Sequence, residues 1–150
     1  PTESTGTTMG GKSINELQLE IRRINKIIDF LRRLLGLQTK VEKLKIEIMV
    51  RKIAAEEKVD PDLIAAVIWC ESGMNPKAVN RNPNGTTDFG LCQFNDYWYR
   101  DVISSEEALN DPQKAVRIMC RKFAEGRGSD WICYRTKKYI HWYKKIGVNV

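Results

Sequence analysis

The 150-residue sequence has no apolar run that approaches the roughly 20 residues needed to cross a bilayer. It has a single histidine, His141, and its four cysteines include no C-x-x-C pair. A metal site needs several such ligands at regular spacing, so neither a metal nor another cofactor is expected. We therefore predict a protein without a membrane span whose chemistry is carried by its own side chains.

The composition and the net charge of the chain limit the kinds of molecule that it is expected to bind. Apolar residues make up 42% of the chain and charged residues 29%, which is ordinary for one compact domain with an appendage. The net charge of +6 suits nucleic acid or an anionic polymer such as a bacterial cell wall, or it only aids solubility. The sequence contains no nucleic-acid recognition motif, so nucleic acid is not an expected partner.

The N-terminal third contains two kinds of segment. Residues 1–13 are small and polar, which predicts a disordered linker, and they lack the apolar stretch of a signal peptide. Residues 14–35 then carry apolar side chains at alternating steps of four and three, which is the period of a coiled-coil seam. The seam residues are Leu17, Ile21, Ile24, Ile28, Leu31 and Leu35.

Gly36 is expected to end or bend this helix, and a second helix is expected over about 38–58. One interpretation is a helical hairpin packed on the main domain. The other is a tether, or a stalk through which the protein associates with itself or attaches to a partner. We assign 14–39 to a helical, coiled-coil-like extension and 40–150 to the main domain.

Local signals place the remaining elements. Asp60-Pro61 and Asp111-Pro112 each combine an N-cap aspartate with a proline at the first helical position, which predicts two helix starts. The first of these helices is expected to end at about Ser72. A small antiparallel sheet is expected over residues 77–96, a short connection from 99 to 111, and a last helix over roughly 130–145.

Two carboxylates, one before the predicted sheet and one within it, have different surroundings. Glu71 follows Val67 and Ile68 by four and three positions, so it lies at the edge of an apolar helical face that disfavours its charged form. Asp88 follows the polar segment 84–87, which favours its ionised form. Cleavage of a glycosidic bond needs two carboxyl groups that face each other across a slot, one protonated and the other ionised. The pair therefore predicts a glycosidase, with Glu71 as the acid.

Polar and aromatic side chains after Asp88 suit a sugar ligand. Gln93 and Asn95 offer amide donors and acceptors to sugar hydroxyl and acetamido groups, and Trp98 and Tyr99 offer flat faces to sugar rings. A surface carboxylate, a turn-capping aspartate and a row of core aromatics would explain each feature separately. The conjunction at fixed spacing favours the binding cleft.

The stretch from Glu71 to Tyr99 resembles the catalytic region of c-type lysozymes. The matching phrases are E-S, N-x-x-A-x-N-R-N, G-x-T-D-F-G and Q-F-N-D-x-W-Y. The phrases E-S-G-M-N-P-K-A-V and G-L-C-Q-F also resemble soluble lytic transglycosylases. The resemblance implies a mainly α (α+β) lysozyme-like fold with Glu71 and Asp88 as the catalytic residues. It further implies a set of substrate-binding residues: Asn80, Asn82, Gln93, Asn95, Trp98, Tyr99 and Trp131, the last packing on Glu71.

This resemblance implies cleavage of the β-1,4 bond between N-acetylmuramic acid and N-acetylglucosamine in peptidoglycan glycan strands. We expect hydrolysis, because Asp88 is present and an A-Y-N-A-G-like segment typical of lytic transglycosylases is absent. The alternatives are a lytic transglycosylase that yields a 1,6-anhydro product, and a non-catalytic or structural cell-wall-binding module. An enzyme of this kind acts outside the cell or in the cell envelope. A location on a virion is also compatible with this activity.

The cysteines leave two alternatives. Cys70, Cys92, Cys120 and Cys133 are even in number, so an exported protein could form two disulfides with three pairings. All four lie in apolar segments or beside the predicted cleft, where buried free thiols are equally compatible with the sequence.

Overall fold

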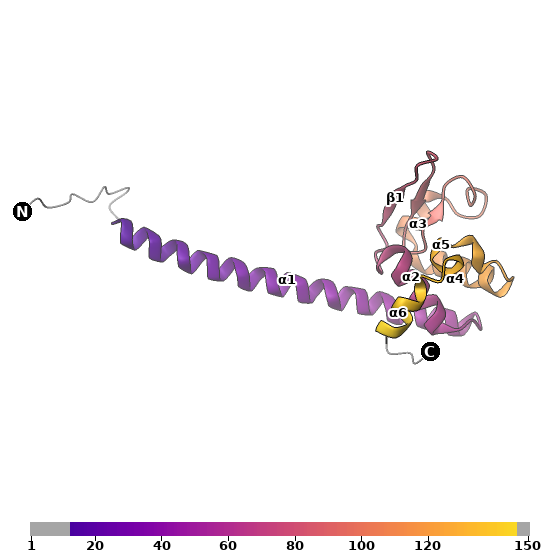
Figure 1. Cartoon of the computed structure of the whole chain (residues 1–150), viewed down its shortest axis with the longest axis horizontal. Helices are drawn as coiled ribbons and strands as arrows, with labels where there is room; N and C mark the ends of the chain where they lie inside the picture. The colour runs from indigo at the N-terminus through magenta and orange to yellow at the C-terminus, as the bar shows by residue number, and fades with distance from the viewer. Residues whose placement is uncertain (1–12, 147–150) are drawn as a thin grey trace, which may run out of the picture. The chain divides into compact units, whose positions relative to one another are not determined.

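The computed structural model describes residues 13–146, and the chain divides into two compact units, Pro1–Glu42 and Lys43–Val150. Figure 1 labels the helices α1 to α6 and the strand β1. The predicted linker 1–13 lies, apart from Ser13, outside the described residues. No helix among residues 13–146 is both long and apolar enough to span a membrane.

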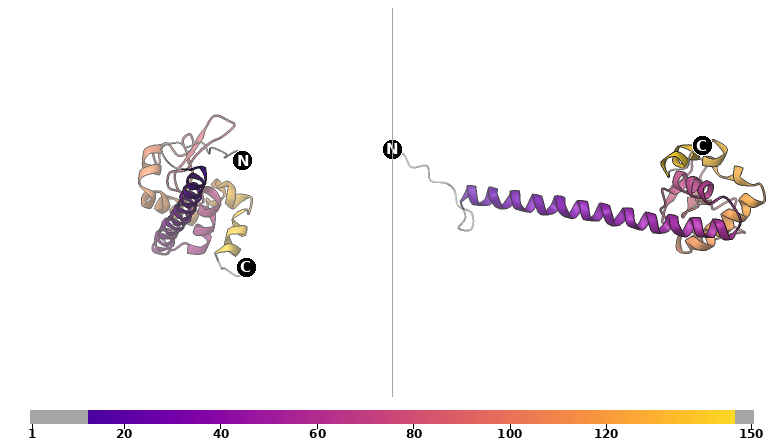
Figure 2. Two further views of the ribbon diagram at one scale, coloured as in Figure 1. Left: turned by 90° about the vertical axis from the view of Figure 1, so that its left-hand side faces the viewer. Right: turned by 90° about the horizontal axis from the view of Figure 1, so that it is seen from below.

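Helix α1 (Ile14–Glu56) is one uninterrupted α-helix of 43 residues, as Figure 2 shows. The predicted end or bend at Gly36 is therefore wrong, and with it the separate second helix and the helical hairpin. Gly36 does not adopt a positive φ, and its neighbours Leu35 and Leu37 are strong helix formers. One internal glycine costs about 1 kcal/mol relative to alanine, which is too little to break a helix this long.

The predicted seam is exposed in the first unit. Between Ile21 and Leu35 its side chains are 39–65% exposed, and further apolar side chains beside the seam, such as Ile27 and Phe30, are exposed as well. Leu17 is half-buried. Burial of such a stripe against another surface is favourable by about 25 cal/mol per Å² of apolar area removed from water.

Helix α2 (Pro61–Ser72) forms the centre of the second unit and confirms the predicted helix. Asp60 caps its start by accepting hydrogen bonds from the N–H groups of Asp62 and Leu63. Residues 64–68 are completely buried, and Gly73 ends the helix with a left-handed φ of 61°. Because the apolar middle of α2 is held in the core, its last turn carries Glu71 to the edge of that core.

A three-stranded antiparallel sheet confirms the prediction for residues 77–96. It contains β1 (Val79–Arg81), β2 (Thr87–Phe89) and β3 (Phe94–Asn95) in that spatial order. The register pairs Asp88 with Asn80 on one side and with Asn95 on the other. Directly opposed residues share one face of a sheet, so the register collects these three polar side chains on the same face.

Helix α3 (Ser105–Asn110) occupies what was predicted to be only a short connection between residues 99 and 111. A capping box between Ser104 and Glu107 starts it, and this S-x-x-E signal is present in the sequence. Gly90 lies at the turn between β2 and β3 with φ 75°, and a Cβ there would lie 2.0 Å from the carbonyl oxygen of Ala108. The sheet and α3 therefore approach closely only because this position is glycine.

The C-terminal part packs back on α2. Helix α4 (Pro112–Ala124) starts at its predicted N-cap, Asp111. The predicted helix over 130–145 is instead three short elements: η1 (Gly128–Asp130), α5 (Ile132–Arg135) and α6 (Tyr139–Lys145). Tyr134 stacks on Tyr139 at 5.4 Å, whereas residues five apart lie on different faces of a continuous helix. The turn at Lys137, with φ 59°, allows this stacking.

Aromatic contacts fasten α6 to α2. Trp142 stacks on Trp69 with 5.3 Å between ring centroids, and the hydroxyl of Tyr143 donates to Asp60. The indole N–H of Trp69 donates to Glu47 at the end of α1 that belongs to the second unit. The result is a mainly helical α+β fold of the lysozyme-like type with a small antiparallel sheet, as the sequence predicted.

Candidate active site

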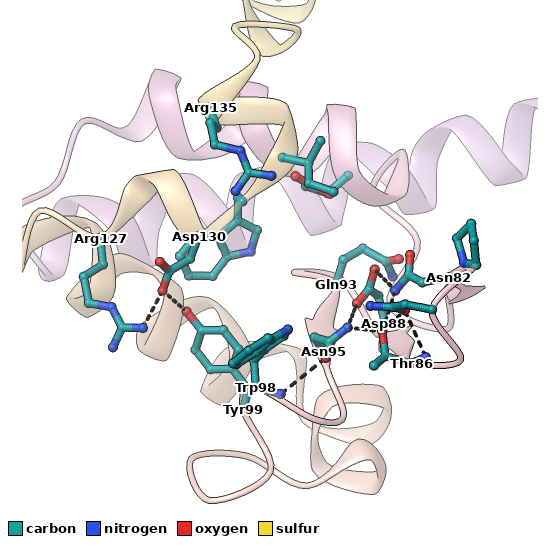
Figure 3. A pocket seen from close by; sticks show the side chains of 15 residues that line it. Asn82, Thr86, Asp88, Gln93, Asn95, Trp98, Tyr99, Arg127, Asp130 and Arg135 are labelled. Carbon is teal, nitrogen blue, oxygen red and sulfur yellow. Dashed lines mark hydrogen bonds and ion pairs between the residues drawn. The ribbon is translucent and has the colours of Figure 1, made fainter.

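A cavity of about 620 Å³ lies in the second unit and is shown in Figure 3. Its lining comes from the end of α2, from the sheet and its turns, and from the segment around η1 and α5. It contains every predicted site residue except Asn80. The lining residues are Glu71, Asn82, Pro83, Asn84, Thr86, Asp88, Gln93, Asn95, Trp98, Tyr99, Arg127, Asp130, Trp131, Ile132 and Arg135.

Glu71 is half-buried on the last turn of α2. This burial raises the pKa of its carboxyl above the ordinary value of 4.5, and the negative charge of Asp88 raises it further. The N–H of Cys133, which donates to Oε1 at 2.9 Å, lowers the pKa in part. Burial is the larger effect, so Glu71 keeps its proton to a higher pH than an exposed glutamate does.

Asp88 lies on the central strand, and two amides hold its carboxylate. The Nδ2 of Asn95 donates to one oxygen at 2.7 Å, and the Nδ2 of Asn82 donates to the other at 3.0 Å. Both amides also donate to Oγ1 of Thr86, which in turn donates to Asn84. Figure 3 shows this polar cluster at one end of the cavity. The orientation of the Asp88 carboxylate is therefore fixed by Asn95 on β3 and by Asn82, which directly follows β1.

Gln93 and Asn80 form a second amide pair beside the sheet. The Oε1 of Gln93 accepts from Nδ2 of Asn80 at 2.6 Å, and its Nε2 donates to the carbonyl of Gly90 at 2.7 Å. Gln93 is buried and has a positive φ of 53°, which is uncommon for a residue with a side chain. These contacts hold the turn between β2 and β3. The substrate-binding roles of all the site residues stay predictions, and Asn80 differs from the others in lying outside the lining.

The three predicted aromatic residues differ in exposure. Trp98 is 74% exposed at the rim, so its ring face is available to a ligand. Tyr99 is buried, and its hydroxyl donates to Asp130 at 2.6 Å. Trp131 is buried with Phe94 and Phe123, and its indole N–H donates to the carbonyl of Cys92. Trp131 and Glu71 line the same cavity, while their direct packing stays a prediction.

Charged residues at the other end of the cavity were not predicted. Arg127 forms an ion pair with Asp130 at 2.7 Å, and Arg135 donates to the carbonyl of Ser129. Figure 3 places these side chains across the cavity from the Asp88 cluster. Arg135 lies four positions after Trp131, which is a predicted site residue, so this short segment could have pointed to Arg135. Nothing in the local sequence pattern points to Arg127.

The cysteines follow neither alternative completely. Cys70 and Cys133 form a disulfide across 63 positions of sequence, whereas Cys92 and Cys120 are buried thiols. Burial raises the pKa of both free thiols, and Cys120 reaches about 12, so neither is a reactive thiolate near neutral pH. Within residues 13–146, no cluster of three or more histidine, cysteine or acidic side chains could hold a metal ion.

Among the comparisons with known proteins, one family match includes both Glu71 and Asp88. A family model described as "Transglycosylase SLT domain" matches residues 48–126. "Lysozyme C-1" of Anas platyrhynchos is 32% identical over 80 residues, which cover 45% of this chain and 54% of that protein. "Protein IpgF" of Shigella flexneri is 38% identical over 61 residues, covering 39% and 40%. "Invasion protein IagB" of Salmonella typhimurium (strain SL1344) is 33% identical over 64 residues, covering 40% of each. The chain thus spans about half the length of the curated relatives it matches.

Proposed function

Because the chain belongs to the transglycosylase SLT domain family, we propose that it cleaves peptidoglycan glycan strands. The bond is the β-1,4 link between N-acetylmuramic acid and N-acetylglucosamine, and the reaction is hydrolysis. The observation that carries this proposal is the pair of carboxylates, Glu71 and Asp88, in one cavity with different surroundings. Such a pair matches the two roles that glycoside hydrolysis requires.

Glu71 is the general acid of the proposed reaction. Its Oε1 accepts the N–H of Cys133, so Oε2 carries the proton that passes to the glycosidic oxygen. As the bond to the leaving sugar breaks, positive charge develops on the remaining ring. Asp88, held by Asn82 and Asn95, either attacks this centre or stabilises its charge, and water then completes hydrolysis. Trp98 at the rim contributes a flat face for a neighbouring sugar.

A second candidate is a lytic transglycosylase, which the family match itself favours. In that reaction the 6-hydroxyl of the muramic acid attacks its own ring, so the product is a 1,6-anhydro sugar and no water is consumed. Glu71 would have the same role in both reactions. Asp88 distinguishes them, because internal attack does not require a second carboxylate.

Mass spectrometry of the fragments released from purified peptidoglycan tests this proposal. Hydrolysis leaves reducing muramic ends, whereas transglycosylation leaves ends that are lighter by one water. We expect reducing ends, with Glu71→Gln as the inactive control. Anhydro ends would contradict hydrolysis and support the lytic transglycosylase reaction. The absence of any released fragment would contradict both reactions.

The proposed substrate also implies where the protein acts. Peptidoglycan lies outside the cytoplasmic membrane, so we place the enzyme outside the cell or in the cell envelope, and a virion that meets the wall is one such setting. The net charge of +6 suits an anionic wall polymer.

The exposed seam of α1 supports a proposal of self-association. Apolar side chains at alternating steps of four and three from Ile21 to Leu35 match the spacing that pairs helices in a coiled coil. A single helix leaves these apolar side chains exposed to water, which is unfavourable. A second copy of the same helix would bury them. We therefore propose that two or more copies pair along residues 17–35.

Replacing Ile24 and Ile28 together by lysine is expected to convert an oligomer to a monomer. The two charges would lie inside the paired seam, where burial without a partner is costly. Light scattering measures the mass. The matched control is Asn15→Lys with Asp29→Asn, which adds the same net charge on the side of α1 away from the seam and should leave the oligomer intact. A wild type that stays monomeric at high concentration would rule out this role for the seam.

A further inference from the structure

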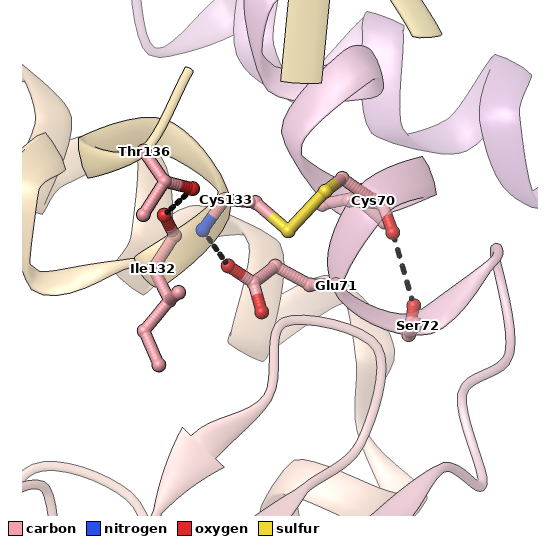
Figure 4. Close-up of a disulfide and its surroundings, with 7 residues drawn as sticks. Cys70, Glu71, Ser72, Ile132, Cys133 and Thr136 are labelled. Carbon is pink, nitrogen blue, oxygen red and sulfur yellow. Dashed lines mark hydrogen bonds between the residues drawn. A yellow bond between two sulfur atoms is a disulfide. The ribbon is translucent and has the colours of Figure 1, made fainter. Parts of the chain in front are cut away.

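The disulfide and the proposed acid share the same two segments. Cys70 directly precedes Glu71 on the last turn of α2, and Cys133 lies in the first turn of α5. The backbone N–H of Cys133 donates to Oε1 of Glu71 at 2.9 Å. Figure 4 shows both connections side by side. A covalent bond therefore joins the residue beside the acid to the residue that donates to the acid.

The hydrogen bond from Cys133 determines which carboxyl oxygen is available. An accepted N–H occupies Oε1, so the proton of the neutral acid lies on Oε2. After proton transfer, the same N–H stabilises the carboxylate that remains. The first N–H groups of a helix have no partner within it, and Trp131 at the N-cap of α5 provides no side-chain acceptor. Glu71 is the acceptor that Cys133 uses instead.

Helix α5 depends on tertiary contacts for its position, and one of them is the buried indole of its N-cap residue, Trp131, which donates to Cys92. It contains only four residues, and a helix this short is not stable without tertiary contacts. Among its residues only Cys133 is buried, whereas Ile132 and Arg135 are exposed and Tyr134 is half-buried against Phe123 and Tyr139. Neither of these ring contacts reaches α2. The disulfide is therefore the covalent anchor that holds the Cys133 N–H against Glu71.

We propose that the Cys70–Cys133 disulfide is a positioning element for Glu71, and that its reduction slows turnover without unfolding the protein. The inference rests on the proposed role of Glu71 as the acid. A dithiol reductant supplies two electrons and two protons, which convert the disulfide to two thiols while the reductant becomes a cyclic disulfide. Ile132 and Arg135 of α5 also line the cavity, whereas the Asp88 cluster and Trp98 come from other segments, so kcat should fall more than KM rises.

The test compares kcat and KM of the oxidised wild type, the dithiothreitol-treated wild type and the Cys70→Ser/Cys133→Ser variant on soluble peptidoglycan fragments. Misplacement of a reacting group by about 1 Å costs up to roughly 10²-fold in rate. We expect kcat to fall between about 10- and 100-fold in both altered forms, with KM within about twofold. Reoxidation of the treated wild type should restore kcat, and dithiothreitol should not slow the serine variant further.

Controls separate positioning from stability. Cys120→Ala removes a buried thiol outside the cavity and should respond to dithiothreitol as the wild type does. Near-UV circular dichroism at the assay temperature checks that each form is folded. If the serine variant does not fold, the reduced wild type alone is used for the test. An unchanged kcat in a folded, reduced protein, or a rise of KM alone, would overturn the inference. Inactivity of the oxidised wild type would instead contradict the proposed function, and this inference with it.

Discussion

Glu71→Gln is expected to lower kcat for peptidoglycan cleavage by roughly 10²–10⁴-fold, the usual contribution of a general acid. This loss corresponds to about 3–5 kcal/mol of transition-state stabilisation. Glutamine has no proton to give to the leaving oxygen, and the sequence offers no second acid in the same place on α2. We expect a loss at the upper end of this range, because an alkoxide leaving group is difficult to expel without protonation.

The substitution is selective for chemistry. The side-chain oxygen of glutamine can still accept the N–H of Cys133, so α5 keeps its contact with α2. Glu106→Gln, an exposed change of the same kind on α3, serves as the matched control and should retain full activity. Clearing of a peptidoglycan suspension by Glu71→Gln at close to the wild-type rate would remove Glu71 from its proposed role.

The sequence predicted those elements whose signals are local. The Asp-Pro pairs at 60–61 and 111–112 fixed two helix starts because capping depends on neighbouring residues only. The turn-rich segment around Gly85 likewise predicted the sheet, and with it the neighbourhood of Asp88. The S-x-x-E capping box of α3 is an equally local signal, so this helix too is predictable from the sequence.

Other features depend on contacts between distant segments. The pairing of Cys70 with Cys133 follows from the packing of α5 near α2, which no spacing rule determines. The break between α5 and α6 reflects ring stacking of Tyr134 on Tyr139, a tertiary contact. At Gly36 a local signal is misleading in the opposite direction, because the helix formers around this glycine outweigh its tendency to end a helix. Arg127 and Asp130 reach the cavity wall only through the three-dimensional fold, so the sequence did not predict that they line the cavity.

Asp88→Asn is expected to lower kcat by roughly 10²-fold or more, because a charge that stabilises the developing positive sugar is lost. Asparagine also replaces one acceptor oxygen by an amide that donates, although Asn82 and Asn95 both donate to this position. Some loss of stability is therefore expected, and the melting temperature must show that the variant is folded during the assay. Asp101→Asn, an exposed aspartate outside the cavity, is the matched control.

The turnover of folded Asp88→Asn on purified peptidoglycan, with the released ends identified by mass, tests the two-carboxylate mechanism most directly. The mechanism predicts a large loss of turnover in this variant and reducing muramic ends from the wild type. A variant that cleaves at close to the wild-type rate, together with 1,6-anhydro ends from both proteins, would contradict hydrolysis by Glu71 and Asp88.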